Sequence, residues 1–149
     1  MQANDRTQPK PGKSPIINIK KPQTFVLDNG MKILIVEDDA ISKLLITIAV
    51  KPFSREIIKV STGIEAIEIC RKFPDIDLVM MDINMPEMGG YEATNEIRKF
   101  NKNIVIIAQT ANGMQSDHDN AIKAGCNDYI SKPINISTLS KLICKNFKK

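Results

Sequence analysis

Several features are scarce in this sequence of 149 residues, and each scarcity excludes a class of protein. The three cysteines, Cys70, Cys126 and Cys144, are odd in number and widely spaced, and they form no zinc-binding pattern. We therefore expect reduced and mostly buried thiols. The longest strongly apolar stretch, residues 44–50, is far too short to span a bilayer, and the N-terminus has no apolar signal-peptide core. These absences predict a cytoplasmic location, either of the whole protein or of the cytoplasmic part of a membrane-bound parent.

Excess charge is also scarce outside the N-terminus. Residues 1–30 carry five basic and two acidic side chains, whereas the rest of the chain carries 16 basic and 15 acidic ones. The same 30 residues contain four of the eight prolines. This composition is typical of a solvated linker and is a weak argument for nucleic-acid binding, so we expect no direct contact with nucleic acid. We predict a linker or flexible N-terminal arm over residues 1–30 and one domain over residues 31–149.

Strand and helix patterns alternate throughout the predicted domain. Continuous apolar runs are typical of parallel strands that are covered on both faces. These runs are residues 33–36, 78–81, 104–108 and 128–130. A run that mixes charge with apolar residues, 56–60, suits an edge strand. Helical spacing of apolar residues follows each run, and five such βα units predict an α/β fold with one parallel sheet and right-handed crossovers.

Two of the predicted helices bear on function. The first begins after Asp39, whose carboxylate can cap it, and ends before Pro52. Its predicted buried face consists of the apolar residues Ile41, Leu44, Leu45, Ile48 and Ala49. The fourth helix spans about residues 115–124 and ends at Gly125. Its apolar stripe is the thinnest of the five, so we expect this helix to move most easily.

Polar side chains that suit phosphoryl chemistry stand at the carboxyl ends of four predicted strands. Glu37 and Asp38 follow the first strand, and Asp82 follows the run 78–81. Thr110 and Lys132 follow the two remaining runs. Because the carboxyl ends of parallel strands share one edge of the sheet, these side chains are predicted to meet in one crevice. Each residue alone is ordinary at a helix cap or in a loop, and it is their joint placement that indicates a functional site.

This set of residues suits the transfer of a phosphoryl group to a carboxylate. Asp82 can attack phosphorus and form an acyl phosphate. The negative charge of the phosphoryl oxygens must be neutralised, and Mg²⁺ prefers hard oxygen ligands of the kind gathered here. The candidate ligands are Glu37, Asp38, Asp82 and the backbone carbonyl of Asn84. Lys132 and Thr110 can contact the remaining phosphoryl oxygens.

Four segments carry a family resemblance. They are ILIVEDD (33–39), MDINMPEMGG (81–90), IAQTA (107–111) and YISKP (129–133). Together they resemble the receiver domain of two-component response regulators. The resemblance implies a flavodoxin-like, doubly wound sheet of five parallel strands in the order 2-1-3-4-5, with five helices. It also implies that Asp82 is the phosphoacceptor, that Thr110 and Lys132 contact the phosphoryl group, and that Tyr129 is an aromatic switch that follows Thr110.

The function implied by this resemblance is that of a phosphorelay acceptor. Asp82 would take a phosphoryl group from phosphohistidine with the help of Mg²⁺, and the domain would then change conformation. Such a chain catalyses its own phosphorylation and dephosphorylation and is not an enzyme for a separate substrate. Its implied partners are a histidine kinase or histidine phosphotransfer domain and a downstream output domain or regulator. His118, the one histidine, lies between Asp117 and Asp119, which suits a solvated helix face better than a phosphoryl donor.

Two features depart from the commonest family pattern. Glu37 stands where Asp is usual, and no output domain follows the last predicted helix. The motifs are most similar to receivers at the C-terminus of hybrid sensor histidine kinases, and a free-standing single-domain response regulator is the alternative. A phosphatase with an aspartate nucleophile would need a second acid where Asn84 stands. A flavodoxin-like FMN site is disfavoured, because the acids at residues 37–39 would repel the phosphate of FMN. A pseudo-receiver that only binds partners is also disfavoured, because it would not need Asp82, Thr110 and Lys132 to be intact.

Overall fold

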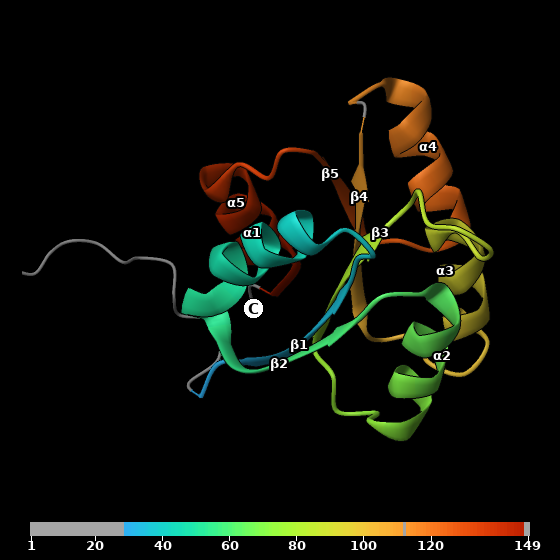
Figure 1. Ribbon diagram of the computed structural model, residues 1–149, viewed down its shortest axis with the longest axis horizontal. Helices are drawn as coiled ribbons and strands as arrows, with labels where there is room; N and C mark the ends of the chain where they lie inside the picture. Colours follow the sequence, from blue (N-terminus) through green and yellow to red (C-terminus); the bar gives the residue numbers. More distant parts are fainter. Residues whose placement is uncertain (1–28, 112, 148–149) are drawn as a thin grey trace, which may run out of the picture.

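The computed structural model describes residues 29–111 and 113–147. These residues form a five-stranded parallel sheet in the order β2-β1-β3-β4-β5, and helices cover both of its faces (Figure 1). The strands are β1 (Met31–Val36), β2 (Ser54–Val60), β3 (Leu78–Asp82), β4 (Val105–Thr110) and β5 (Asp128–Ser131). The α-helices are α1 (Ala40–Val50), α2 (Gly63–Lys72), α3 (Gly90–Arg98), α4 (Gln115–Ala124) and α5 (Ile136–Phe147), and a short 3₁₀ turn, η3 (Lys51–Phe53), follows α1. The predicted doubly wound α/β fold is confirmed.

The predicted N-terminal arm lies almost entirely outside the described residues, so its boundary with the domain stays a prediction. Among the residues that the structure does describe, no helix is both long enough and apolar enough to cross a membrane.

The sheet separates two apolar cores. Alternate residues of a strand point to opposite faces, so on β1 Ile33 and Ile35 pack toward α1 and α5, while Leu34 and Val36 pack toward α2, α3 and α4. Figure 1 shows the same division, with α1 and α5 together on one face and the other three helices on the opposite face. Burial of each such side chain contributes about 1.5–3 kcal/mol. The two cores therefore hold β1 and β3 firmly in register, with Val36 beside Met81, and this register aligns the ends of the two strands.

The predicted buried face of α1 is wrong for all but one residue. Ala49 is buried, together with Ile46 and Val50. The remaining members of the predicted face are exposed: Ile41 (70%), Leu44 (59%), Leu45 (51%) and Ile48 (56%). Apolar residues occur on more than one side of the helix, so their spacing is compatible with two different buried faces. The face that packs on the sheet is the one that contains Ile46, Ala49 and Val50. The predicted cap is confirmed, because the Asp39 carboxylate accepts a hydrogen bond from the Ser42 N–H at 2.8 Å.

Helix α4 has the predicted bounds, and its contact with the rest of the domain is small. Its buried residues are Ala121 and Ala124. Gly125 ends the helix in the left-handed conformation (φ 110°), which glycine adopts without strain. The Tyr91 hydroxyl of α3 donates a hydrogen bond to the Asp117 carbonyl at 3.2 Å. Short alanine side chains bury little apolar area, so α4 is the helix with the weakest apolar anchorage.

The cysteines fit the prediction of reduced and mostly buried thiols. Cys70 and Cys126 are buried, Cys144 is half-buried, and none of the three forms a disulfide. Burial raises the pKa of the Cys70 thiol to about 12 and that of Cys126 to about 11, because a thiolate is poorly solvated there.

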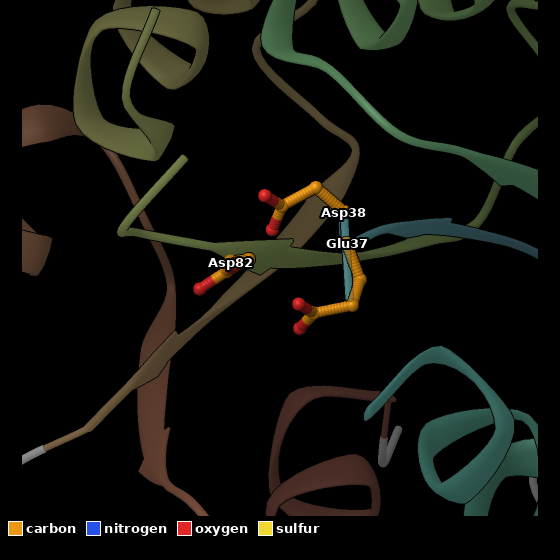
Figure 2. Close-up of side chains that lie close together, drawn as sticks. All are labelled: Glu37, Asp38 and Asp82. Atoms are coloured by element: carbon orange, nitrogen blue, oxygen red, sulfur yellow. The ribbon is translucent and has the colours of Figure 1, made fainter. Parts of the chain in front are cut away.

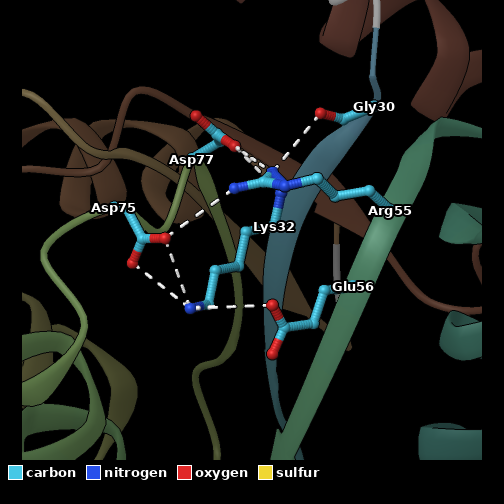
Figure 3. Close-up of polar contacts among 6 residues, drawn as sticks. All are labelled: Gly30, Lys32, Arg55, Glu56, Asp75 and Asp77. Atoms are coloured by element: carbon cyan, nitrogen blue, oxygen red, sulfur yellow. Dashed lines mark hydrogen bonds and ion pairs between the residues drawn. The ribbon is translucent and has the colours of Figure 1, made fainter.

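A charge cluster ties β1 to β2 and to the segment before β3, at the edge of the sheet opposite the strand carboxyl ends (Figure 3). The Lys32 side chain is almost fully buried, and its ammonium lies 3.2 Å from Asp75, 3.6 Å from Glu56 and 4.2 Å from the centre of the Phe73 ring. The Lys32 backbone N–H also donates to the Asp77 carboxylate at 2.9 Å. One buried cation therefore holds acidic side chains from two separate parts of the chain.

Replacement of Lys32 by Met should lower the free energy of unfolding by about 1–2 kcal/mol. Asp75 and Glu56 are more than half exposed, so the loss should be smaller than that of a fully buried ion pair. Urea unfolding measures it. Lys99→Met is the matched control, because Lys99 pairs with Glu96 on the exposed surface and its loss should change stability by less than about 0.5 kcal/mol. Equal effects of the two substitutions would contradict the role given to Lys32.

Candidate functional site

The ends of β1 and β3 bring three carboxylates together. Glu37 and Asp38 follow β1, and Asp82 is the last residue of β3. One carboxylate oxygen from each lies within 4.8 Å of the other two, and Figure 2 shows Asp38 and Glu37 on either side of the β3 ribbon with Asp82 between them. Glu37 and Asp82 are each only 1% exposed, whereas Asp38 is exposed. The sequence prediction that these three acids share one crevice therefore agrees with their positions.

Lys132 joins the two buried carboxylates. Its ammonium nitrogen lies 2.9 Å from Glu37 Oε1 and 3.1 Å from Asp82 Oδ1. Burial by itself lowers the pKa of Lys132, but the hydrogen bonds to Glu37 and Asp82 outweigh it and the pKa is raised. For Glu37 the balance is different: burial raises the pKa of its carboxyl more than the hydrogen bond from Lys132 lowers it. The two buried carboxylates thus depend on one ammonium group for neutralisation of their charge.

The backbone around Asp82 is held by the start of α3. The Asn84 N–H donates to Asp82 Oδ1 at 3.2 Å, and the Gly90 N–H donates to the Ile83 carbonyl at 3.1 Å. A Cβ atom on Gly90 would lie 2.9 Å from the Ile83 Cα, closer than real Cβ contacts allow. A glycine is therefore required at this first residue of α3, and it lets the helix approach the strand end that carries Asp82.

The two predicted switch residues lie on neighbouring strands. Thr110 ends β4 and is buried, and its carbonyl accepts a hydrogen bond from the Lys132 N–H at 2.7 Å. Tyr129 on β5 is half-buried and packs in the core beneath α4. Its ring centre lies 5.1 Å from that of His118, and the ring planes are tilted by 58°. The side chain of His118 is 40% exposed on α4, as its acidic neighbours predicted.

The three carboxylates fit a magnesium ion. Two oxygens bound to one Mg²⁺ at 2.0–2.1 Å are at most about 4.2 Å apart, so small side-chain rotations would complete the approach. Asp38 is exposed and can make such a rotation. The two buried acids, with one ammonium between them, carry an uncompensated negative charge that a cation would neutralise. The assignment of the Asn84 carbonyl as a fourth ligand stays a prediction.

Sequence reasoning missed two features of this site. The ion pair between Lys132 and Glu37 joins residues that are 95 positions apart, and no local pattern announces it. The second is Gln109, which precedes Thr110 and whose side chain is completely buried. A polar residue at the end of an apolar strand was the available signal, but it did not reveal on which face the amide lies.

The sheet order and the cluster of Glu37, Asp38 and Asp82 around Lys132 agree with the receiver resemblance of the sequence. Residues 33–144 match the family model described as "Response regulator receiver domain", and the chain belongs to this family.

Two similar curated proteins show different domain contexts. Histidine kinase 3 of Arabidopsis thaliana is 31% identical over 153 residues, which cover 86% of this chain but only 15% of the kinase. The polar-differentiation response regulator DivK of Brucella ovis is 34% identical over 106 residues, which cover 70% of this chain and 85% of DivK. The chain thus spans a small part of the first relative and most of the second.

Two similar solved structures carry information about ligands and partners. A chain from the co-crystal structure of the Saccharomyces cerevisiae histidine phosphotransfer protein Ypd1 with the receiver domain of Ssk1 has a TM-score of 0.73 and 30% identity, over 80% of this chain and 90% of that one. The receiver domain of a sensor histidine kinase from Pseudomonas aeruginosa PAO1 has a TM-score of 0.71 and 32% identity, over 80% of this chain and 99% of that one. That receiver holds a magnesium ion in its active-site cleft.

Replacement of Lys132 by Met should destabilise the metal-free protein by about 2–4 kcal/mol, because two buried carboxylates would lose their cation. Urea unfolding in the presence of a chelator measures this loss. Millimolar Mg²⁺ should restore at least half of it, since the ion binds the folded site and not the unfolded chain.

The loss of stability in Lys132→Met should also depend on pH in a defined direction. The pKa of Glu37 is raised above its ordinary value of 4.5, so the folded state takes up a proton more readily than the unfolded chain. Protonation removes one of the two negative charges. The deficit of Lys132→Met in chelator should therefore shrink as the pH falls from about 8 to about 5. A deficit that is constant over this range, or that grows, would contradict the charge argument.

Proposed function

We propose that Asp82 is the phosphoacceptor of a two-component phosphorelay and takes its phosphoryl group from a phosphohistidine on another domain. The observation that carries the proposal is the position of the Asp82 carboxylate. It is buried at the end of the central strand, lies 3.1 Å from the Lys132 ammonium and shares a cluster with Glu37 and Asp38. Family membership makes the chain a phosphoacceptor signalling domain rather than an enzyme in the usual sense.

The hydrogen bonds to Asp82 indicate which of its oxygens reacts. Lys132 and the Asn84 N–H both contact Oδ1, so we assign Oδ2 as the nucleophile. Oδ2 attacks phosphorus, the P–N bond to the donor histidine breaks, and its electron pair stays on the imidazole nitrogen. When bound, Mg²⁺ supplies neutralisation of the charge on the phosphoryl oxygens.

Lys132 and Thr110 act on the transferred group. The Lys132 ammonium already lies beside Asp82, and it exchanges its contact with the carboxylates for a contact with a phosphoryl oxygen. The Thr110 hydroxyl, from the end of β4, donates to another phosphoryl oxygen. Most of the rate enhancement in this scheme comes from positioning and charge neutralisation.

Phosphorylation with a small phosphodonor tests the assignment directly. Acetyl phosphate with Mg²⁺ should add one phosphoryl group to the wild-type chain, and hydroxylamine should remove it, because an acyl phosphate is sensitive to this nucleophile. Asp82→Asn, which keeps the shape but removes the nucleophilic oxygen, should not be labelled; mass spectrometry of the intact protein measures both. Asp39→Asn is the control, since Asp39 caps α1, and it should be labelled like wild type. Equal labelling of Asp82→Asn and wild type would refute the proposal.

For the parent protein, we propose that residues 31–149 are the C-terminal receiver of a hybrid histidine kinase. The support is the similarity to Histidine kinase 3, of which the matching segment is only 15%. A free-standing response regulator is the second candidate, because DivK matches over 85% of its own length. The reading frame upstream of residue 1 in the gene distinguishes the two: a kinase core there supports the first, and its absence supports the second.

We further propose that the exposed apolar face of α1, formed by Ile41, Leu44 and Ile48, binds the protein that carries the phosphohistidine. The face adjoins the site, because Leu45 of α1 and Lys132 line the same cavity. Exposed apolar side chains in a contiguous row mark an interaction surface. A donor that reaches Asp82 must cover the surface around it, and α1 offers the apolar part of that surface.

Serine substitutions separate docking from chemistry. The double variant Leu44→Ser with Ile48→Ser should be labelled by acetyl phosphate at the wild-type rate. Its rate of transfer from a phosphorylated histidine phosphotransfer protein that labels wild type should fall at least about ten-fold, which corresponds to about 1.4 kcal/mol of lost contact. Ile64→Ser on α2 is the control, because Ile64 is also exposed but lies on the opposite face of the sheet. Unchanged protein-to-protein transfer in the double variant would exclude this docking face.

Finally, we propose that phosphorylation is transmitted through Thr110 and Tyr129 to α4. A Thr110 hydroxyl drawn toward the phosphoryl group would shift the loop after β4, and the ring of Tyr129 would follow. Helix α4 is held by two small buried residues, so a bias of a few kcal/mol is enough to change its position. Hydrogen exchange measures this: phosphorylation should change protection across residues 113–135. Changes confined to residues 82–90 would show that the switch does not operate.

A further inference from the structure

Helix α4 is attached to the rest of the domain unevenly along its length. Its two buried side chains, Ala121 and Ala124, both lie near its C-terminal end. The preceding helical residues, 115–120, are all exposed or half-buried. In Figure 1 the helix begins at the top of the view, and its lower end lies beside α3. The apolar anchorage of α4 is therefore confined to its C-terminal end.

Arg98, the last residue of α3, fixes this C-terminal end through its guanidinium group. Its Nε donates a hydrogen bond to the Gly125 carbonyl at 2.8 Å, and its Nη1 donates to the Asn101 carbonyl at 3.1 Å. Its Nη2 donates to Asn127 Oδ1 at 2.8 Å, and the same oxygen accepts from the Ile106 N–H of β4 at 2.8 Å. One side chain thus joins the end of α3, the end of α4 and the beginning of β4.

The shape of this contact is specific for glycine and arginine. A Cβ atom on Gly125 would lie 2.9 Å from Arg98 Cγ, which is closer than real Cβ contacts allow. Glycine therefore lets the stem of Arg98 pack directly against the helix end. The acceptors of the guanidinium are all uncharged oxygens, so Arg98 supplies a rigid fork of donors and does not neutralise an acid. A single ammonium group could not reach all of these acceptors at once.

The N-terminal end of α4 is held by weaker contacts. The hydroxyl of Tyr91, at the start of α3, donates a hydrogen bond to the Asp117 carbonyl at 3.2 Å. The ring centre of His118 lies 5.1 Å from that of Tyr129 on β5. Met114, which precedes the helix, forms no side-chain cap. Because water reaches these side chains, their contacts are weak, and this end of the helix can move while the other stays in place.

We propose that Arg98 is a positioning residue that makes the C-terminal end of α4 a fixed pivot, so that a phosphoryl signal tilts the helix and displaces only its N-terminal half. The inference rests on the proposed function of Asp82 and specifies how the conformational change is carried out. The signal leaves Thr110 through residues 111–114 and so reaches the weakly held end first. Since the ten residues of α4 span about 15 Å, a tilt of about 15° would move its N-terminal end by about 4 Å.

Distances between nitroxide spin labels, measured by double electron–electron resonance, test the pivot. Ser116→Cys and Lys123→Cys place labels at exposed positions seven residues apart, which project from the same side of α4. The reference label is Glu68→Cys on α2 or, in a second series, Ser137→Cys on α5, so that tilts in different directions are detected. All variants carry Cys144→Ser, which leaves only buried native thiols.

Beryllium trifluoride with Mg²⁺ mimics the phosphorylated state. Its addition to wild-type protein should change at least one distance from position 116 by about 2 Å or more, and both distances from position 123 by less than about 1 Å. Equal displacement of the two positions, or displacement of neither, overturns the proposal. Failure of the phosphoacceptor assignment would be recognised separately, because acetyl phosphate would then not label Asp82.

Arg98→Met removes the hydrogen bonds of the guanidinium and keeps most of the side-chain volume. In this variant position 123 should move with beryllium trifluoride about as far as position 116, and Arg98→Lys should behave in the same way. Arg71→Met is the matched control and should behave like wild type, because the Arg71 guanidinium lies on α2 and stacks 4.3 Å from the centre of the Phe100 ring. If position 123 stays fixed in Arg98→Met, Arg98 contributes only stability, and the role given to it is wrong.

The unphosphorylated protein provides a test that does not depend on Asp82. Tyr91→Phe removes the hydrogen bond at the N-terminal end of α4 and leaves Arg98 in place. The distribution of distances from position 116 should broaden in this variant, and that from position 123 should stay as narrow as in wild type. Equal broadening at both positions would contradict a fixed C-terminal pivot, even if Arg98→Met did not fold.

Discussion

The burial of two carboxylates side by side is the constraint on which the functional edge of this domain depends. Glu37 and Asp82 are nearly inaccessible to water, and one ammonium, from Lys132, lies within 3.1 Å of both. Burying charges is costly unless they are paired, so the loop after β5 has to reach back across the sheet to supply the cation. The sheet order makes this geometry available, because it sets β1 and β3 next to each other in the centre. The cost of this arrangement is also what makes the edge responsive to an added cation or phosphoryl group.

The two layers of helices contribute differently to the domain. On one face, α1 is anchored by Ile46, Ala49 and Val50 and presents a second apolar row outward. On the other, α4 is held by two alanines and by the contact of Tyr91 with its backbone. Helix α1 is firmly anchored beside the acidic site, whereas α4 is loosely held on the other face. This difference suits a domain that receives a signal at one surface and changes its conformation at another.

Much of the fold was predictable from local pattern, and the exceptions have physical reasons. Apolar runs that end on polar residues located the strands, and the strand ends located Glu37, Asp38 and Asp82. The buried face of α1 was not predictable, because apolar residues occur on more than one side of the helix and spacing alone does not show which side packs on the sheet. The contact of Lys132 with Glu37 needs the completed sheet order, since the two residues are 95 positions apart. Most of the predicted arm, up to residue 28, lies outside the described residues.

The deep position of Cys70 and Cys126 has a consequence for redox sensitivity. Oxidants and alkylating reagents react with the thiolate, and thiols with pKa values of about 12 and about 11 are almost entirely protonated at neutral pH. Both sulfurs are also closed off in the core under α2, α3 and α4. Oxidative stress therefore reaches these two cysteines only when that core opens. Oxidation of Cys70 or Cys126 would therefore report unfolding of this core and would not alter a phosphoryl signal carried by the folded domain.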